Sequence, residues 1–234
     1  LPPTLLRRLA TLPTGELAVL AVRLRERSRA LAALLDAVAP ARRGQLYDLA
    51  LADVDTATLV PAVELMEVLP AEVRVREARR VLGLATTRER EAEVRTWSAY
   101  LAWPDAAAAL DAALRSGDAD ERAHGYPLLV AAARRSRDPQ AVAEVIVRLG
   151  RLRNEQDPVR AAALTALAKV APLLTADMAA GLTGLTTDAV DARDASAATT
   201  RALSTLAADV LACHIDVPPL CEWALLTIDL VSTG

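Results

Sequence analysis

Asp157, Pro158, Val159 and Arg160 form the most motif-like string in a chain that is built mainly from Ala, Leu, Val and Arg. A catalytic carboxylate at Asp157 would need a second acid or base as its partner, and none lies nearby in the sequence. An aspartate at the start of a helix instead accepts a hydrogen bond from an exposed backbone N–H, and its charge suits the positive end of the helix dipole. We therefore interpret Asp157 as a structural residue that starts a helix.

The two histidines and two cysteines raise the question of a metal site. His214 adjoins Cys213, Cys221 and Glu222 follow, and His124 lies far upstream. Zinc requires four ligands, and paired cysteine ligands are usually separated by two to four residues. Here the cysteines lie eight positions apart and no second Cys/His pair follows. We predict no metal and no cofactor, and two buried structural cysteines close to a terminal capping helix.

An aromatic cluster at Trp97, Tyr100 and Trp103 lies beside Arg95 in a chain whose aromatic content is only 3%. Trp97 and Tyr100 fall on one helical face, where they would form an exposed anchor for a partner, because aromatic residues bring a large contact area at low entropic cost. The alternative is that these side chains fill the core where two helices meet. The sequence leaves both readings open, and the four residues are our candidate partner-binding set.

Arginines form four clusters: Arg23, Arg25, Arg27 and Arg29; Arg74, Arg76, Arg79 and Arg80; Arg134, Arg135 and Arg137; and Arg148, Arg151 and Arg153. A phosphate-binding surface would require several clusters to converge. The last two clusters end consecutive antiparallel helices, where cations offset the negative end of the dipole, so we expect solvated helix ends. The net charge of −3 is uneven, with 14 arginines against 11 acids in residues 1–90 and 2 basic residues against 8 acids in residues 170–234.

The sequence contains no Gly-rich phosphate loop, nucleophile elbow, Ser/His/Asp order or dinucleotide fingerprint. We expect no enzymatic activity and assign no catalytic residue.

Helices must position all of these residues. Of the 234 residues, 53% are hydrophobic, Phe is absent, and Ala and Leu, which favour helices, supply the bulk. Charges interrupt every apolar run well before the roughly 18 residues that a membrane span needs. The first residues do not resemble a signal peptide and lack an initiating Met. We expect a fragment of a longer chain, and a cytoplasmic setting because two cysteines do not make a disulfide framework.

Apolar residues recur with a helical period, and turn residues arrive every 10 to 16 positions. Proline fits the first turn of a helix, and we expect it to open helices at Pro40, Pro70, Pro104, Pro139, Pro158, Pro172 and Pro218. About fourteen helices follow, and they pair into about seven hairpins without a Gly- or Ser-rich linker, as a single domain over residues 1–234. The expected pairs are 3–12 with 15–27, 29–38 with 40–52, 56–69 with 71–84, 87–102 with 104–115, 119–135 with 138–152, 157–171 with 175–185, and 190–212 with 218–231.

The clearest internal repeat aligns "ERAHGYPLLVAAAR" from Glu121 with "VRAAALTALAKVAP" from Val159, at an offset of 38. These segments resemble the HEAT-repeat family in its HEAT-like or PBS-lyase-type form, whose units read D-P-x-V-R-x-A-A-x-x-A-L. The resemblance implies an all-α fold, a right-handed α-solenoid of stacked hairpins. It also implies that an Asp and an Arg of each unit tie neighbouring repeats together, which here are Asp120, Arg122, Asp157 and Arg160. Stacking would also cover the apolar stripe that a single hairpin leaves exposed.

Two functions follow from this reading. The first is a non-catalytic scaffold or regulatory module that binds a protein or peptide on the surface of the solenoid. The alternative is a nucleic-acid-binding solenoid similar to the HEAT-like DNA glycosylases, and the negative net charge counts mildly against it.

Overall fold

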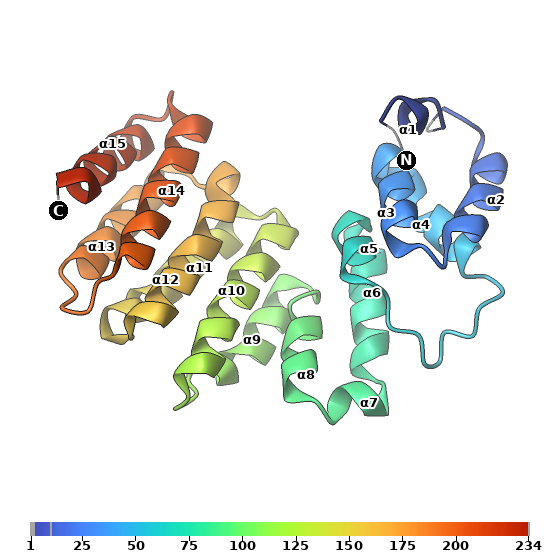
Figure 1. The fold of residues 1–234 in the computed structure, drawn as a ribbon, viewed down its shortest axis with the longest axis horizontal. Helices are drawn as coiled ribbons and strands as arrows, with labels where there is room; N and C mark the ends of the chain where they lie inside the picture. The colour runs from blue at the N-terminus through green and yellow to red at the C-terminus, as the bar shows by residue number, and fades with distance from the viewer. Residues whose placement is uncertain (1–2, 10, 234) are drawn as a thin grey trace. The chain divides into compact units, whose positions relative to one another are not determined.

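The chain is all-helical throughout its described part. The structure is a computed structural model that describes residues 3–9 and 11–233, and within these ranges every regular element is an α-helix or a 3₁₀-helix (Figure 1). The expected all-α class is confirmed. Backbone contacts divide the chain into two compact units, Leu1–Leu101 and Ala102–Gly234. The expectation of one continuous domain remains a prediction, and we describe each unit by itself.

The first unit contains eight α-helices in its described residues. They are α1 (Pro3–Leu9), α2 (Thr14–Leu24), α3 (Ser28–Ala37), α4 (Pro40–Ala50), α5 (Val63–Val68), α6 (Ala71–Leu82), α7 (Ala85–Arg88) and α8 (Glu91–Ser98). Helix α2 packs on α4, α3 packs on α5, and α6 packs on α8. A core that includes Leu17, Leu35, Leu46 and Met66 joins these helices.

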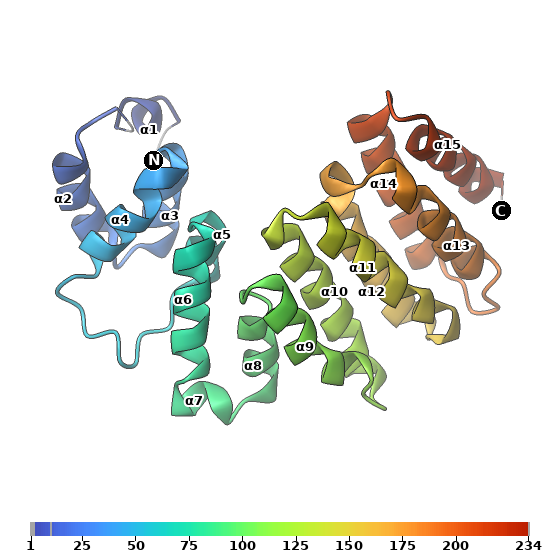
Figure 2. The same cartoon turned by 180° about the vertical axis from the view of Figure 1, so that it is seen from behind.

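The second unit is a series of helices, each of which contacts helices one or two places away in chain order. They are α9 (Trp103–Leu114), α10 (Ala119–Ser136), α11 (Pro139–Leu149), α12 (Asp157–Leu167), α13 (Ala179–Val190), α14 (Ala197–His214) and α15 (Pro218–Thr233), with 3₁₀-helices η1 (Gly150–Asn154), η2 (Ala168–Leu173) and η3 (Ala176–Met178). Helix α12 packs between α10 and α14, whereas α13 packs between α11 and α15. The helices of this unit therefore form two rows that advance in chain order (Figures 1 and 2).

Helix starts follow the turn chemistry of the sequence. Proline occupies the first turn of α4, α9, α11 and α12, and it begins α15, as expected. Asp118, Asp138 and Ser196 cap α10, α11 and α14 by accepting a hydrogen bond from the backbone N–H two residues ahead. Pro70 lies directly before α6, at its N-cap position. Pro172 lies inside η2 and opens no helix.

Two of the expected helices of the first unit are wrong in extent. The helix expected over residues 56–69 is reduced to α5, and residues 53–62 are irregular. Within that stretch the backbone N–H of Ala57 donates to the carboxylate of Asp55, a local turn that competes with a helix, and Pro61 has no N–H to donate. The helix expected over residues 87–102 is divided into α7 and α8 at Glu89 and Arg90.

The second unit also departs from the expected boundaries. The helix expected over residues 157–171 ends as an α-helix at Leu167 and continues as the tighter η2. Helix α13 extends to Val190, where we expected the next helix to begin, and that helix, α14, starts at Ala197. The boundary moves because Ser196 caps α14.

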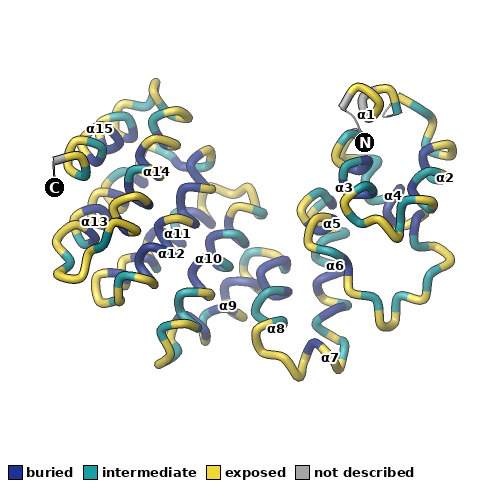
Figure 3. Tube along the Cα trace, in the orientation of Figure 1, coloured by how far each residue is buried: buried dark blue, intermediate teal, exposed yellow. Residues whose placement is uncertain are grey.

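The interior is filled with small side chains. Figure 3 shows buried positions in the helices of the second unit. The buried alanines of this unit are Ala106, Ala107, Ala113, Ala132, Ala133, Ala141, Ala161, Ala163, Ala166, Ala168, Ala171, Ala189, Ala202, Ala207 and Ala224. Helices also approach closely where Gly181 of α13 faces α11, since a Cβ at Gly181 would lie 2.6 Å from Cγ2 of Ile146. Small residues thus let the helices pack at short distances with few aromatic residues.

Among the described residues, no helix is long and apolar enough to cross a membrane.

Candidate partner-binding site

Asp157 and Arg160 connect the start of α12 with the start of α14. The Asp157 carboxylate accepts hydrogen bonds from the backbone N–H of Ser196 at 3.0 Å and from the hydroxyl of Thr199 at 2.7 Å. The guanidinium of Arg160, which is only 2% exposed, donates to the carboxylate of Asp194 at 3.0 Å and to a backbone carbonyl at Glu155. The carboxylate of Asp157 therefore bonds to the next layer of helices, and the expected cap on its own helix is replaced by this contact.

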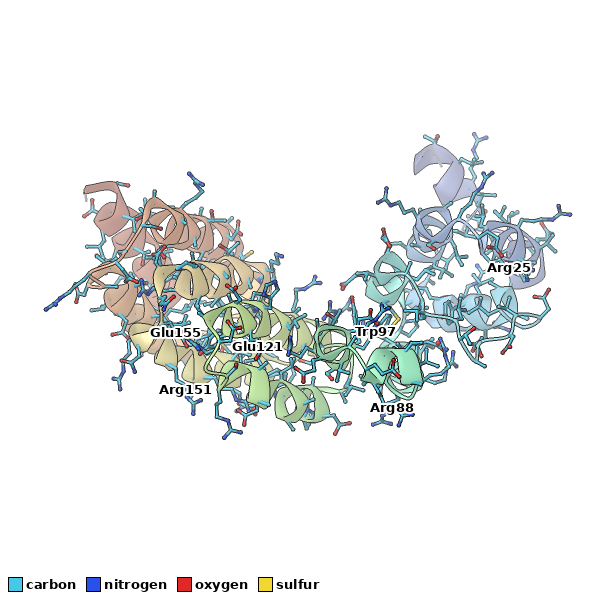
Figure 4. The ribbon with its side chains drawn as sticks, turned by 60° about the horizontal axis from the view of Figure 1, so that its bottom comes forward. Arg25, Arg88, Trp97, Glu121, Arg151 and Glu155 are labelled. Carbon is cyan, nitrogen blue, oxygen red and sulfur yellow. The ribbon has the colours of Figure 1, made fainter. Side chains whose placement is uncertain are left out.

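Arg122 makes a matching contact 38 residues earlier in the chain. Its Nε donates to both carboxylate oxygens of Glu155 at 2.9 and 3.0 Å, and its Nη1 donates to the carbonyl of Ser116 at 2.7 Å (Glu155 is labelled in Figure 4). Asp120, in contrast, lies exposed in the first turn of α10, and the capping residue is Asp118. Together, Arg122, Glu155, Asp157, Arg160 and Asp194 form what we call the polar ladder.

Two acids of the ladder, Asp157 and Asp194, have lowered pKa values. Arg160 and the backbone N–H of Asp157 both donate to Asp194 and hold the pKa of its carboxyl below the ordinary value. Partial burial by itself raises the pKa of Asp157, but the hydrogen bonds from Ser196 and Thr199 and the charge of Arg160 outweigh that effect and leave the pKa lowered. The lowered pKa values of Asp157 and Asp194 favour the ionised carboxylates that these hydrogen bonds and ion pairs require.

Trp97 and Tyr100 belong to the core of the first unit. They are 5% and 3% exposed, and their rings lie 5.6 Å apart (Trp97 is labelled in Figure 4). The hydroxyl of Tyr100 donates to Glu67 at 3.3 Å, and Arg95 lies 3.6 Å from Glu91. The core-filling alternative is therefore confirmed for Trp97 and Tyr100, and the exposed anchor is wrong for these two residues: Trp97 on α8 and Tyr100, two residues after α8, both pack into the core of the first unit.

Trp103 differs from the other two aromatic residues, since it is half-buried at the start of α9. Its indole N–H donates to the carboxylate of Glu144 on α11 at 3.1 Å. The guanidinium carbon of Arg148, one turn further along α11, lies 5.5 Å from the centroid of the indole ring. A cation at this distance from the indole face is attracted by the ring quadrupole, so the two helices present a fixed aromatic and cationic pair.

A groove of about 390 Å³ opens beside this pair. Its lining is Trp103, Pro104, Ala107, Ala108, Asp111, Glu144 and Arg148. Asp111 pairs with Arg115, which directly follows α9, and Glu144 accepts from Trp103 and lies 4.0 Å from Nη2 of Arg148. Nη1 of Arg148 is buried and has no hydrogen-bond partner among the described residues. We call these seven residues the Trp103 groove. It combines an indole ring, a lining of small residues and the side chain of Arg148, which is 37% exposed.

Another groove, of about 610 Å³, lies between α4 and α6 of the first unit, and its lining is Gly44, Gln45, Asp48, Leu49, Glu72, Val73 and Arg76. It has no aromatic side chain, and its arginine is occupied, because Arg76 donates to Asp48 at 2.6 Å. The Trp103 groove is therefore the better candidate for a partner.

The histidines and cysteines are dispersed. The ring Nε2 of His214 lies 2.7 Å from the carbonyl oxygen of Ala171, and Nδ1 of His124 lies 2.7 Å from that of Asp120. Both cysteines are free thiols, and Cys213 is exposed where we expected a buried residue. No group of three or more His, Cys, Asp or Glu side chains in the described chain is arranged to hold a metal ion.

Several arginines of the four clusters bind acids or carbonyls of their own unit. Arg25 pairs with Asp53 (Arg25 is labelled in Figure 4), and Arg80 pairs with Glu77 and donates to the carbonyls of Thr56 and Leu59. Arginines held in this way organise loops and helix ends, and they are not available to phosphates without breaking those contacts.

Comparison with protein-family models, with curated proteins and with solved structures finds no match for this chain.

The sequence singled out Trp103 but not its partners. Glu144 and Arg148 stand four residues apart, which signals only an ordinary helix-surface pair. The contact with Trp103 joins residues 41 positions apart and depends on how α11 lies beside α9. The ladder acids Glu155 and Asp194 were missed for the same reason, although each falls in the turn before a helix.

Proposed function

We propose that this chain is a HEAT-like α-solenoid that acts as a non-catalytic protein-interaction module. The repeated arginine contact supports the solenoid. Arg122 and Arg160 stand 38 residues apart, and each donates to an acid 33 or 34 residues ahead and to a carbonyl five or six residues behind. The same contact at the same spacing is what stacked repeats produce, because each unit meets its neighbour in the same way.

The Trp103 groove carries the proposed function. Binding energy in protein interfaces concentrates in a few residues, mostly Trp, Tyr and Arg, and these residues lie in partly enclosed pockets. Here Trp103 and Arg148 stack at 5.5 Å beside a concave surface of small residues. The hydrogen bond from the indole N–H to Glu144 already orders the Trp103 side chain. Binding of a partner would therefore not incur the entropic cost of ordering it.

The occupied arginines do not favour the nucleic-acid alternative, nor does the net charge of −3. We propose a cytoplasmic setting, which two free cysteines suit.

Selection from a random peptide display library on the purified 234-residue chain tests this proposal. We expect a peptide family that loses at least roughly 30-fold in affinity on Trp103→Ala, since truncating such an anchor costs about 2 kcal/mol or more. Arg148→Ala should weaken the same peptides, whereas Arg201→Ala, which removes an exposed arginine of α14, is the matched control and should not. Peptides that bind the Trp103→Ala and wild-type chains equally would show that the groove is not the binding surface.

A further inference from the structure

Helices α13 and α15 form one end of the second unit and run in the same direction. Short turns join each of them to α14, and α13 contacts α15 directly (Figure 1). The indole N–H of Trp223 on α15 donates to the hydroxyl of Thr186 on α13 at 3.2 Å. Val190 and Leu226 follow this hydrogen bond by one turn on their own helices, so they belong to the same level of the helix pair.

Large apolar side chains are exposed at this level. Leu226 and Leu230 are 64% and 43% exposed, and they lie four residues apart, on one stripe of α15. Val190 is 36% exposed at the end of α13. The opposite side of α15, with Leu220 and Trp223, is buried against the rest of the unit. Exposed large apolar side chains that stand together are typical of an interaction surface.

The charges on this helix pair are acidic. Helices α13 and α15 contain three acids, Asp188, Glu222 and Asp229, and neither contains a lysine or an arginine. Glu222 and Asp229 are exposed and flank Leu226 on α15. Asp191 directly follows α13 and is exposed as well. We call Val190, Asp191, Glu222, Leu226, Asp229 and Leu230 the acidic leucine surface.

The carboxyl ends of the two helices add to this negative potential. A helix carries partial negative charge at its carboxyl end, and basic residues in the last turn offset it. Helices α6, α10 and α11 have arginines there, whereas α13 and α15 have none. The two basic residues of 170–234 are Arg193, in the turn after α13, and Arg201, on α14. Arg193 stands between Asp191 and Asp194 in the sequence, so that turn also has more acids than cations. The parallel helix ends thus favour a cationic partner.

We propose that the acidic leucine surface binds an amphipathic helix of a different protein, whose apolar stripe is flanked by lysines or arginines. Complementary charge identifies this partner, because cations beside the stripe would face Glu222, Asp229 and Asp191, whereas an acidic partner would be repelled. Side chains four residues apart on a helix rise by about 6 Å, the same step that separates Leu226 from Leu230. Apolar residues of a partner helix therefore fit beside these leucines, in the way that amphipathic helices bind apolar grooves of other proteins. This surface is separate from the Trp103 groove and does not rest on the function proposed for that groove.

Selection from a display library of amphipathic helices on the purified 234-residue chain tests this surface. The library fixes a leucine stripe over about 18 residues, roughly 27 Å of helix, and randomises the flanking positions among Lys, Arg, Glu, Asp, Gln and Ser. We expect the enriched peptides to carry a net positive charge. They should bind at least about tenfold more weakly when the salt is raised from about 0.05 to about 0.5 M, since screening weakens exposed charge pairs.

Two variants of the surface and two matched controls locate the binding. Leu226→Ser removes the most exposed apolar side chain of the stripe and should weaken the enriched peptides at least about tenfold. Glu222→Lys should weaken them about fivefold or more, because it places a cation opposite theirs. Val147→Ser removes an exposed apolar side chain of α11, and Asp120→Lys makes the same change in net charge on α10, so both controls should bind as wild type does. All four positions are exposed, and circular dichroism checks that each variant keeps its helices.

Four results would overturn the proposal. Enriched peptides without net positive charge would mean that charge does not select the partner. Peptides that bind Leu226→Ser as they bind wild type, or that all depend on Trp103, would place the binding elsewhere. A library without any enriched peptide would mean that this surface does not bind helices. In sedimentation velocity, a wild type that self-associates while Leu226→Ser stays monomeric would assign the surface to a second copy of this chain.

The variant Trp103→Ala separates this experiment from the test of the proposed function. Peptides that bind the acidic leucine surface should keep their affinity for Trp103→Ala, whereas peptides that bind the Trp103 groove should lose theirs. Failure of one proposal therefore leaves the result for the other unchanged.

Discussion

Replacing Arg160 by alanine should destabilise the second unit more than replacing Arg148 or Arg201 by alanine. Arg160 is 2% exposed and bonds both to Asp194 and to the carbonyl of Glu155. In the Arg160→Ala variant that carbonyl loses its charged donor, and Asp157 and Asp194 lose the cation that faces them. The aliphatic part of the side chain also leaves a cavity among buried neighbours.

The size of the effect follows from these contacts. Removing one partner of a buried ion pair costs about 3–5 kcal/mol. The side chain of Asp194 is 52% exposed, so water recovers part of its charge stabilisation and the lower end of that range applies. We expect a loss of about 3 kcal/mol in the free energy of unfolding, a large part of the roughly 5–15 kcal/mol that is typical of a domain.

Urea denaturation followed by circular dichroism measures this difference. Arg201→Ala is again the matched control, because Arg201 is exposed on α14, and such surface changes stay within about 0.5 kcal/mol. Arg160→Lys should fall between the two, since lysine keeps the charge but not the planar set of donors. A loss below about 1 kcal/mol for Arg160→Ala would refute the reasoning that the ladder stabilises the unit.

Two further predictions concern pH and glycine. The folded-state pKa values of Asp157 and Asp194 are lowered, so their contribution to stability is present above about pH 4 and is lost as the pH falls through the folded values. The free energy of unfolding, measured as the pH is lowered, should therefore fall less steeply below about pH 4 for Asp194→Asn than for wild type. Identical slopes for the two proteins would contradict the lowered pKa of Asp194. Gly181→Ala should lower stability by about 1 kcal/mol, because the overpacking cost against Ile146 exceeds the gain in helix propensity. Gly184 lies on the same helix, but an added Cβ would meet no neighbouring atom within 4 Å. Gly184→Ala should therefore raise the free energy of unfolding by about 0.5–1 kcal/mol.

Local chemistry made much of the fold predictable from sequence. Pro139 and Pro158 lie in the first turns of helices because proline there loses no hydrogen bond, and this needs no knowledge of the neighbours. The helix expected over residues 56–69 was wrong in extent because the N–H of Ala57 bonds to Asp55 in a local turn and Pro61 has no N–H to donate, so the helix begins only at Val63. Periodicity reports which face can be buried, but not where hydrogen bonding to a side chain interrupts the helix.

The candidate site was less predictable, because its contacts join distant parts of the chain. Trp97, Tyr100 and Trp103 have similar sequence surroundings, yet two of them fill a core and the third borders a groove. Helical spacing alone cannot separate these outcomes, since burial depends on which helix lies opposite. The family resemblance predicted a linking role for Arg160, and the structure shows its hydrogen bond to Asp194, a residue that the sequence did not single out because it lies 34 positions away in the turn before α14.

The many buried alanines have a consequence for the entropy of folding. An alanine has no side-chain rotamer to lose when it is buried, whereas a buried methionine or glutamine loses up to about 2 kcal/mol of rotamer freedom. Residues such as Ala133, Ala163 and Ala207 therefore bury only a small apolar area each, but they do so without ordering any torsion. An interior of this kind is less dependent on large apolar side chains, which is how a chain without phenylalanine fills two compact units.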